Sequence, residues 1–448
     1  MDKIILRRKQ FLQSFKDFLR RVVFDDGVLE APVYLNKLLN TIQNASILQI
    51  PVTFGLGKLY SQFGEDFDVV RNSTVIRTNE NGYHDEVAIN TPVIDYADGF
   101  PVLLRQPQGT NFLIDNTDIE NGGFSRNGYD VTNNELLSPD NLMNGALMVN
   151  TGGASSNYVR SNINFTSTEL LQTVCFSYYF KYVNTQWAFL RSLAFTGATS
   201  GGQCYFDVLN GVIGANSFPT NSTVKMTPVA NGWYRVSITQ EIAPLTDASG
   251  LFQIGAVNSD GSNLTSIGNS VGLYLPQAEE GATPSSPIIT GNTPVTRLKD
   301  ELTATISTNS INTEEGAFYV ERANLVIKNG NAIRITDGSA NQNYLSLLNF
   351  ASGRLVAQYR SNGVVDSIGF PINTSIDILE YYSMLLLWDE ENISLYVNEI
   401  FISTTPITYG FTPNSLNTIE IKNVEAKIKD LRVYKSIAEA KLDLPYIS

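Results

Sequence analysis

Residues capable of catalysis are scarce in this chain. It contains one histidine, His84, and two cysteines, Cys175 and Cys204. A Ser-His-Asp or Cys-His arrangement needs an imidazole that shuttles a proton near neutral pH, and no nucleophile motif surrounds His84. A zinc site needs about four nitrogen or sulfur ligands, which these three residues can hardly supply. We therefore expect no nucleophilic catalysis and no zinc site. We expect both cysteines to be buried, unpaired core residues; a disulfide between them, which requires their strands to be neighbours, is the alternative.

Paired carboxylates are the remaining catalytic option, because glycosidases work with two of them. The densest acidic cluster, Asp389-Glu390-Glu391, lies between two strand-like runs and therefore indicates a solvated hairpin tip. No D-x-D-x-D-G pattern marks a calcium loop, so we assign no metal ligands and leave calcium binding open as an alternative. The sequence thus predicts no catalytic residues, no enzyme activity and no cofactor.

Aromatic side chains are better candidates for a functional site. Exposed ring faces stack on the C–H surfaces of sugars, and neighbouring Asn, Gln or Asp side chains can bond the hydroxyl groups. A role in packing the core is the alternative for each of them. The candidates for glycan binding are Trp187, Tyr205, Tyr344, Tyr359, Tyr381 and Trp388.

The elements that would position these residues are mostly strands. Only 17% of the 448 residues are charged, and short apolar-alternating runs follow one another from about residue 115, separated by Gly- and Asn-rich turns. The length suits two or three domains. No apolar run of about 18 residues is present, so we expect no membrane-spanning helix, and the N-terminus does not fit a signal peptide.

The N-terminal segment differs from the rest in charge and pattern. Residues 1–24 predict an amphipathic helix, and a second helical piece is expected over residues 32–42. Residues 1–21 have a net charge of +5, whereas the whole chain has −13, which favours docking of a basic arm on an acidic partner and argues against nucleic-acid binding by the body. We interpret the arm as an anchor or oligomerisation element; packing on the protein's own body is the alternative. The anchor candidates are Ile4, Phe11, Phe15, Phe18, Val22, Arg7, Arg8 and Lys9.

A stretch without helical periodicity follows the arm. Between residues 68 and 113, short β-rich pieces alternate with the turn dipeptides Asn81-Gly82 and Asp98-Gly99, and prolines keep the backbone extended. We interpret this stretch as an extended leader that lies along another surface and ends by entering a sandwich.

The leader resembles that of tail-fibre, head-fibre and adhesin-type proteins of tailed bacteriophages. The matching residues are Arg71, Ser73, Arg77, Asn79, Gly82, Glu86, Val87, Ala88, Asn90, Pro92, Asp95, Tyr96, Pro101, Leu103, Leu104, Pro107, Gln108, Thr110 and Asn111. Val93 and Gln106 depart from the usual Arg and Glu.

Two later stretches carry resemblances of their own. The run Asn231-Gly232-Trp233-Tyr234-Arg235-Val236 resembles a strand of carbohydrate-binding-module-like jelly rolls. The runs at residues 315–321 and 428–434 resemble the first and last strands of laminin-G-like sandwiches, although Glu399 stands where Gly is usual in a strand between them. The resulting prediction is a mostly-β chain with two tandem jelly-roll or concanavalin-like β-sandwiches. Its parts are a helical arm (1–50), an extended leader (51–115), a carbohydrate-binding-module-like sandwich (116–300) and a laminin-G-like sandwich (301–448).

The resemblance implies a structural virion protein of a tailed bacteriophage, either a head or tail fibre or a decoration subunit. It would be assembled in the host cytoplasm, exposed on the particle surface, and bound to capsid or tail proteins through its arm. The sandwiches would adhere to host-surface or environmental glycans, and the chain would form a homo-oligomer, a trimer as the first expectation and a dimer as the second. No membrane or nucleic-acid partner is expected. The alternatives are a polysaccharide-degrading tailspike and a secreted bacterial lectin, the latter requiring an export signal.

Overall fold

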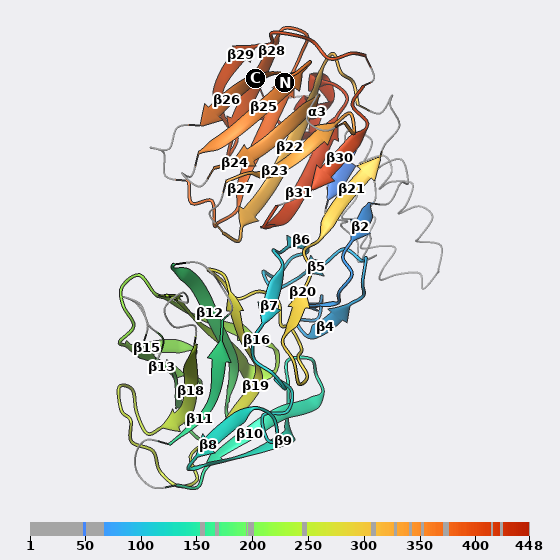
Figure 1. Cartoon of the computed structure of the whole chain (residues 1–448). Coiled ribbons are helices and arrows are strands. Elements are labelled where there is room, and N and C mark those ends of the chain that lie inside the picture. Colours follow the sequence, from blue (N-terminus) through green and yellow to red (C-terminus); the bar gives the residue numbers. More distant parts are fainter. Residues whose placement is uncertain are drawn as a thin grey trace, which may run out of the picture.

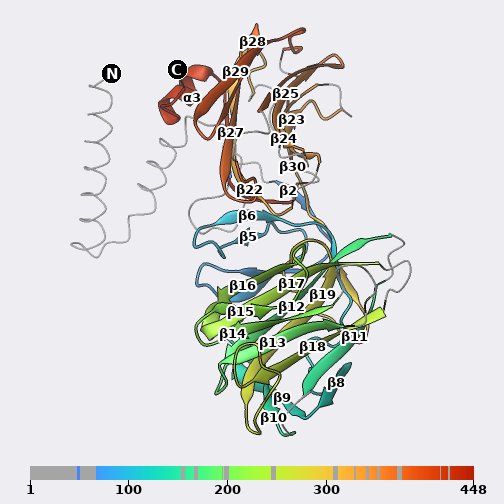
Figure 2. The same ribbon diagram turned by 90° about the vertical axis from the view of Figure 1, so that its left-hand side faces the viewer.

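The computed structural model describes Leu48–Ile50 and residues 67–447, apart from 153–156, 166–169, 194, 196–200, 244–248, 306–310, 327–328, 340–342, 351–353, 371–375, 414 and 422–423. The predicted arm and all of its anchor candidates lie outside these residues. Figures 1 and 2 show two lobes, one above the other, with short strands between them. Within the described residues, no helix is long and apolar enough to cross a membrane.

The first lobe is a sandwich of two antiparallel six-stranded sheets. Alternation sets its core: Val236 and Ile238 of β17 are fully buried in the core between the sheets, so Arg235 and Ser237 point to the outer face. One sheet has the order β16 (Thr223–Val229), β17 (Trp233–Ile242), β12 (Gln172–Tyr182), β19 (Ser270–Glu280), β10 (Met143–Asn150), β9 (Tyr129–Leu137). The other has the order β15 (Val212–Asn216), β14 (Gly202–Asp207), β13 (Trp187–Leu193), β18 (Ser249–Val257), β11 (Tyr158–Asn164), β8 (Phe124–Asn127).

The second lobe is also a sandwich of two antiparallel sheets around one apolar core. One sheet has the order β29 (Ile400–Pro406), β28 (Asn392–Val397), β27 (Tyr382–Trp388), β22 (Gly316–Asn324), β31 (Ala426–Tyr434), β6 (Val102–Arg105), β5 (Ile94–Asp95), and β1 (Leu48–Ile50) also pairs with β31. The other has the order β2 (Asp68–Val70), β21 (Glu301–Thr305), β30 (Thr418–Ile421), β23 (Asn331–Thr336), β24 (Tyr344–Asn349), β25 (Leu355–Ser361), β26 (Val364–Phe370). A short helix, α3 (Ile437–Asp443), is capped by the Ser436 side chain. The predicted mostly-β fold of antiparallel sandwich sheets is confirmed within the described residues.

The stretch interpreted as a leader supplies strands to the second lobe. β6 pairs with β31, and β2 pairs with β21, so strands more than 200 residues apart in sequence are neighbours. Leu103 of β6 is fully buried in the apolar core of that sandwich. The rest of the stretch forms the hairpin of β3 (Val75–Thr78) and β4 (His84–Val87), and β7 (Gly109–Asn111), which pairs with β20 (Val295–Arg297). Two chain segments therefore connect the lobes side by side. The first holds β2 to β7, and the second holds β20 and β21.

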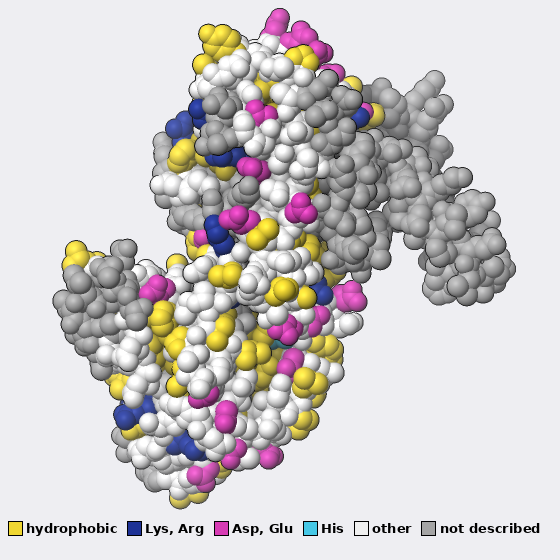
Figure 3. Space-filling view, turned by 45° about the vertical axis from the view of Figure 1, so that its right-hand side comes forward, with side chains coloured by type: hydrophobic (Ala, Val, Ile, Leu, Met, Phe, Trp, Pro, Cys, Tyr) yellow, Lys and Arg dark blue, Asp and Glu magenta, His cyan; other side chains and the backbone are white. Residues whose placement is uncertain are grey.

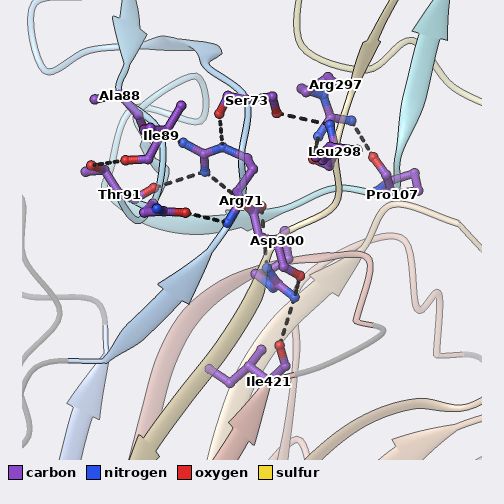
Figure 4. A network of polar contacts seen from close by, with 12 residues as sticks. Arg71, Ser73, Ala88, Ile89, Thr91, Pro107, Arg297, Leu298, Asp300 and Ile421 are labelled. Atoms are coloured by element: carbon purple, nitrogen blue, oxygen red, sulfur yellow. Dashed lines mark hydrogen bonds and ion pairs between the residues drawn. The ribbon is translucent and has the colours of Figure 1, made fainter.

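A buried polar network ties these two segments together (Figure 4). The Arg71 guanidinium lies 2.5 Å from the Asp300 carboxylate and also donates to the carbonyls of Ala88 and Thr91. Arg105 approaches the same carboxylate at 3.4 Å. Because Arg71 and Arg105 belong to the first segment and Asp300 to the second, this network holds both connections in one place. We call it the joint.

Candidate functional site

Two of the predicted glycan-binding residues lie in the core of the second sandwich. Trp388 is fully buried and donates its indole N–H to the carbonyl of Asn312, and Tyr359 stacks on Phe411 at 4.1 Å. Neither ring presents a face to a ligand. Trp388 lies on a strand that is buried over most of its length, where the sequence cannot tell an inward ring from an outward one. Tyr359 lies between the half-buried Gln358 and Arg360, an alternation that indicates an inward ring.

Tyr344 lies on the outer face of β24, but it is covered. The guanidinium groups of Arg334 and Arg360 lie 4.8 and 5.8 Å from its ring centre, one on a strand on either side. The Tyr344 residue is only 6% exposed. Its ring face is therefore occupied by the protein's own cations.

Trp187 and Tyr205 come together on the outer face of the first sandwich, in one apolar cluster with Phe189. The polar end of this cluster is already satisfied, because three donors meet on the side-chain oxygen of Asn263: Arg191 at 2.9 Å, Gln203 at 2.9 Å and the Tyr205 hydroxyl at 3.0 Å. A ligand would have to displace Asn263 to reach these donors.

Tyr381 has a different position, beside a cleft between the two sandwiches. The cleft has a volume of about 560 Å³ and is lined by residues of the leader stretch, of the first sandwich and of the second. Figure 3 shows acidic and basic side chains gathered where the molecule narrows between the lobes. No other predicted aromatic candidate lines this cleft.

On the Tyr381 side of the cleft, polar contacts hold the turn between β5 and β6 against the second sandwich. The Tyr381 hydroxyl donates to Asp98 at 2.7 Å, and the Lys427 ammonium donates to the same carboxylate at 2.6 Å. Burial and the neighbouring Asp98 raise the pKa of Tyr381 above its ordinary value, so the hydroxyl stays protonated. Phe100 lies 5.4 Å from the Tyr381 ring and, like it, is half-buried. The Lys429 ammonium lies 5.2 Å from the Phe100 ring centre and 5.7 Å from the Tyr381 ring centre. Two half-buried rings, this cation and the Asp98–Lys427 ion pair therefore meet at one place.

The opposite wall is the outer face of β12 and β17. Arg235 lies 5.4 Å above the Tyr179 ring and donates to the Ser177 hydroxyl at 2.9 Å. His84 meets the edge of the same ring at 5.5 Å. Burial, assisted by the Arg235 charge, lowers the pKa of His84 to about 4, so the imidazole is neutral at pH 7.

Three polar atoms of the lining residues have no hydrogen-bond partner in the described part of the chain. They are His84 Nδ1, Arg235 Nε and Asn324 Oδ1, and each of the three atoms is buried. Asn324 is only 3% exposed and His84 only 7%. Leaving such a group unpaired costs about 1–3 kcal/mol.

Carboxylates also line the cleft, which the sequence did not indicate. Asp95 accepts the backbone N–H groups of Thr78 and Ala97, and burial raises its pKa above the ordinary value. Asp98 is ion-paired to Lys427. In the sequence, Asp98 stood out only as half of a turn dipeptide, and no local signal placed Asp95, Phe100 or Arg235 in one site.

The other sequence candidates for chemistry stay apart from the cleft. Asp389 accepts the N–H groups of Glu391 and Asn392, so this acidic cluster forms the predicted hairpin turn. Cys175 and Cys204 are buried and unpaired, as predicted. In the portion of the chain that the structure describes, no group of three or more His, Cys, Asp or Glu side chains is arranged to hold a metal ion.

No protein-family model and no curated protein sequence matches this chain. Among solved structures, it is similar to the binding domain of botulinum neurotoxin serotype G, with 17% identity and a TM-score of 0.27 over 33% of this chain and 40% of that one. It is also similar to the CBM40 domain of the Ruminococcus gnavus IT-sialidase bound to α2,3-sialyllactose (12% identity, TM-score 0.25, 29% of this chain, 82% of that one). A third is domain 4 of an extracellular arabinanase from Geobacillus stearothermophilus in complex with arabinotriose (7% identity, TM-score 0.27, 34% and 73%). The chain thus spans about 40% of the neurotoxin domain it matches, and likenesses this low carry no argument about its function.

Proposed function

We propose that this chain is a structural, non-enzymatic protein of a tailed-bacteriophage particle that contacts host-surface or environmental glycans. The cleft between the sandwiches carries the binding part of this proposal, because aromatic rings and charged side chains of both lobes line one space. The phage part rests on the resemblance of the leader. Head fibre, tail fibre and decoration subunit are all compatible with it.

The chemistry of the cleft suits a saccharide. Tyr381 and Phe100 offer half-buried rings, and the exposed Asp98 carboxylate and the Lys427 ammonium beside them offer hydrogen-bonding groups for sugar hydroxyls. The space is large enough for a short oligosaccharide at about 560 Å³. One such contact is weak, but many copies on a particle would compensate through avidity.

Glycan-array screening of the full chain, followed by calorimetry on the best ligand, tests this proposal. Tyr381→Ala should weaken binding by about tenfold, because the ring face and the contact with Asp98 are both lost. Tyr381→Phe keeps the ring and should bind nearly as well as wild type. Tyr409→Ala is the matched control, since this tyrosine is 53% exposed and lies outside the cleft. A blank array, or a Tyr381→Ala protein that binds like wild type, would overturn the proposal.

A polysaccharide-degrading enzyme is the second candidate, and one observation favours it. Asp95, whose pKa is raised by burial, lies in the same cleft as the ion-paired Asp98, and glycosidases pair a protonated with an ionised carboxyl group. Incubation with capsular polysaccharides should release reducing ends if this candidate is right, and Asp95→Asn should abolish the release. A chain that only binds glycans should release no reducing ends from any polysaccharide that it binds.

A further inference from the structure

We infer that the cleft prefers acidic saccharides, and that Arg235, with Lys225 beside it, receives the carboxylate of a sugar. This inference rests on the proposed glycan binding and names the chemical class of the ligand. The ligand would carry a carboxylated sugar toward the first sandwich, with a neutral ring toward Tyr381.

The two cations lie on neighbouring strands and face the cleft. In the antiparallel pair of β16 and β17, Lys225 is opposite Ser237 and Thr227 is opposite Arg235. Val236 of β17 is buried in the sandwich core, and Met226 of β16 packs against that core. Alternation therefore directs Lys225 and Arg235 to the outer face, and both side chains line the cleft.

The other two cations of the cleft wall are already neutralised. Arg77 pairs with Asp85 at 2.9 Å, and Lys427 pairs with Asp98 at 2.6 Å. Among the described residues, Arg235 and Lys225 make no ion pair. The unpaired positive charge of the cleft thus lies on the wall formed by the first sandwich.

Arg235 is half-buried in the wall of the cleft and is held by two neighbours. One guanidinium nitrogen donates to the Ser177 hydroxyl, and the guanidinium carbon lies 5.4 Å from the Tyr179 ring centre. A planar carboxylate matches the donors of a guanidinium group. The contacts with Ser177 and Tyr179 hold the guanidinium in place, so little order has to be imposed when the anion binds.

The charge of the whole protein makes this local arrangement selective. The chain carries −13 overall and repels polyanions in general. Glu380 lines the cleft from the second sandwich, whereas Asp98 on the same side is already paired with Lys427. A carboxylate is therefore attracted toward Arg235 and repelled from Glu380, which sets the direction of the bound saccharide.

The test compares paired ligands on the full chain. Each acidic oligosaccharide of a panel is measured beside the same molecule with its carboxyl groups reduced to alcohols; oligogalacturonides provide one such pair. We expect the acidic form to bind at least about tenfold more tightly, with the difference shrinking as salt is raised. Sulfated oligosaccharides without carboxyl groups form a third set of ligands, and they should not bind more tightly than the carboxylated ones.

Variants assign the preference to the two cations. Arg235→Gln should remove the preference, so that this variant binds the acidic and the reduced forms equally, and Lys225→Gln, at an exposed position, should diminish it without affecting folding. Arg160→Gln is the matched control, because Arg160 lies 5.3 Å above Tyr158 in the same kind of stack but outside the cleft. Arg160→Gln should keep the full preference.

The outcomes separate this inference from the proposed function. Equal binding of the acidic and reduced forms by wild type, or a preference that survives in both Arg235→Gln and Lys225→Gln, overturns the inference and leaves glycan binding in place. A preference for sulfate over carboxylate also overturns it. Binding of neither form of any pair counts against the proposed function itself.

Discussion

At the scale of single residues, His84 is the group whose charge state depends most on the fold. It is 7% exposed, and burial lowers its pKa from 6.5 to about 4. Above pH 6.5 the imidazole is neutral in the folded and the unfolded chain, so it contributes no pH dependence. Between pH 6.5 and pH 4 the unfolded chain takes up a proton that the folded chain does not. The free energy of unfolding therefore decreases as the pH is lowered through this range.

His84→Gln should remove this loss. The wild-type free energy of unfolding should fall by up to about 3 kcal/mol more than that of the variant between pH 7.5 and pH 4. Urea unfolding at several pH values measures the difference. The carboxylates titrate in both proteins, so their contribution cancels in the comparison. Parallel pH profiles for the two proteins would show that His84 is not the source.

The joint gives a second prediction at this scale. Asp300→Asn leaves Arg71 and Arg105 buried without their shared carboxylate, and loss of a buried partner costs roughly 3–5 kcal/mol. Glu301→Gln is the control, since Glu301 pairs with Lys299 at the surface, where an ion pair contributes less than about 1 kcal/mol. Chemical denaturation compares the two. Similar small losses for both variants would contradict a structural role for the joint.

At the scale of elements, strands of the leader complete the second sandwich rather than only lying on it. β2 covers the edge of β21, and β6 and β1 share the edge of β31. Leu103 packs in the same core as Leu431 and Val433 from the end of the chain. The second sandwich therefore depends on residues that precede the first.

Truncation tests this dependence. A chain of residues 67–448 should unfold cooperatively, whereas one of residues 116–448 lacks β2, β5, β6 and β7 and should expose apolar surface. Dye binding and circular dichroism report the difference, and a separate peptide of residues 67–115 should restore order to the shorter chain. Equal melting temperatures for the two truncations would refute the dependence.

At the scale of the whole molecule, the two side-by-side chain segments and the joint keep the lobes together. Tyr381 and Lys427 hold Asp98, in the turn between β5 and β6, against the second sandwich, so this wall of the cleft is fixed by contacts of one lobe.

The attachment itself is predicted from the basic, Phe-rich arm. Deleting residues 1–47 leaves β1 in place, and it should release the protein from purified particles while leaving the melting temperature of the described lobes unchanged. Quantitative mass spectrometry of particles measures occupancy, and light scattering measures the oligomeric state. Full occupancy with an unaltered oligomer would contradict the anchor.

The sequence by itself determined the features that depend on neighbouring residues. Alternation in Tyr234–Thr239 predicted a strand with one buried face, the Asp389 cluster predicted a turn, and the turn-separated strands predicted antiparallel sandwiches. Periodicity and turn chemistry are local properties, and a linear pattern is enough to read them.

Only the tertiary structure decided which strands are neighbours and which rings remain accessible. Nothing local distinguishes Trp388, which is buried in the core, from Tyr381, which borders the cleft, because the face a ring points to depends on the sheet packed above it. Asp98 and Lys427 are 329 residues apart, and Arg71 and Asp300 are 229 apart. Pairings at such separations follow from the packing of whole sheets, so the cleft and its charges exist only in the folded chain.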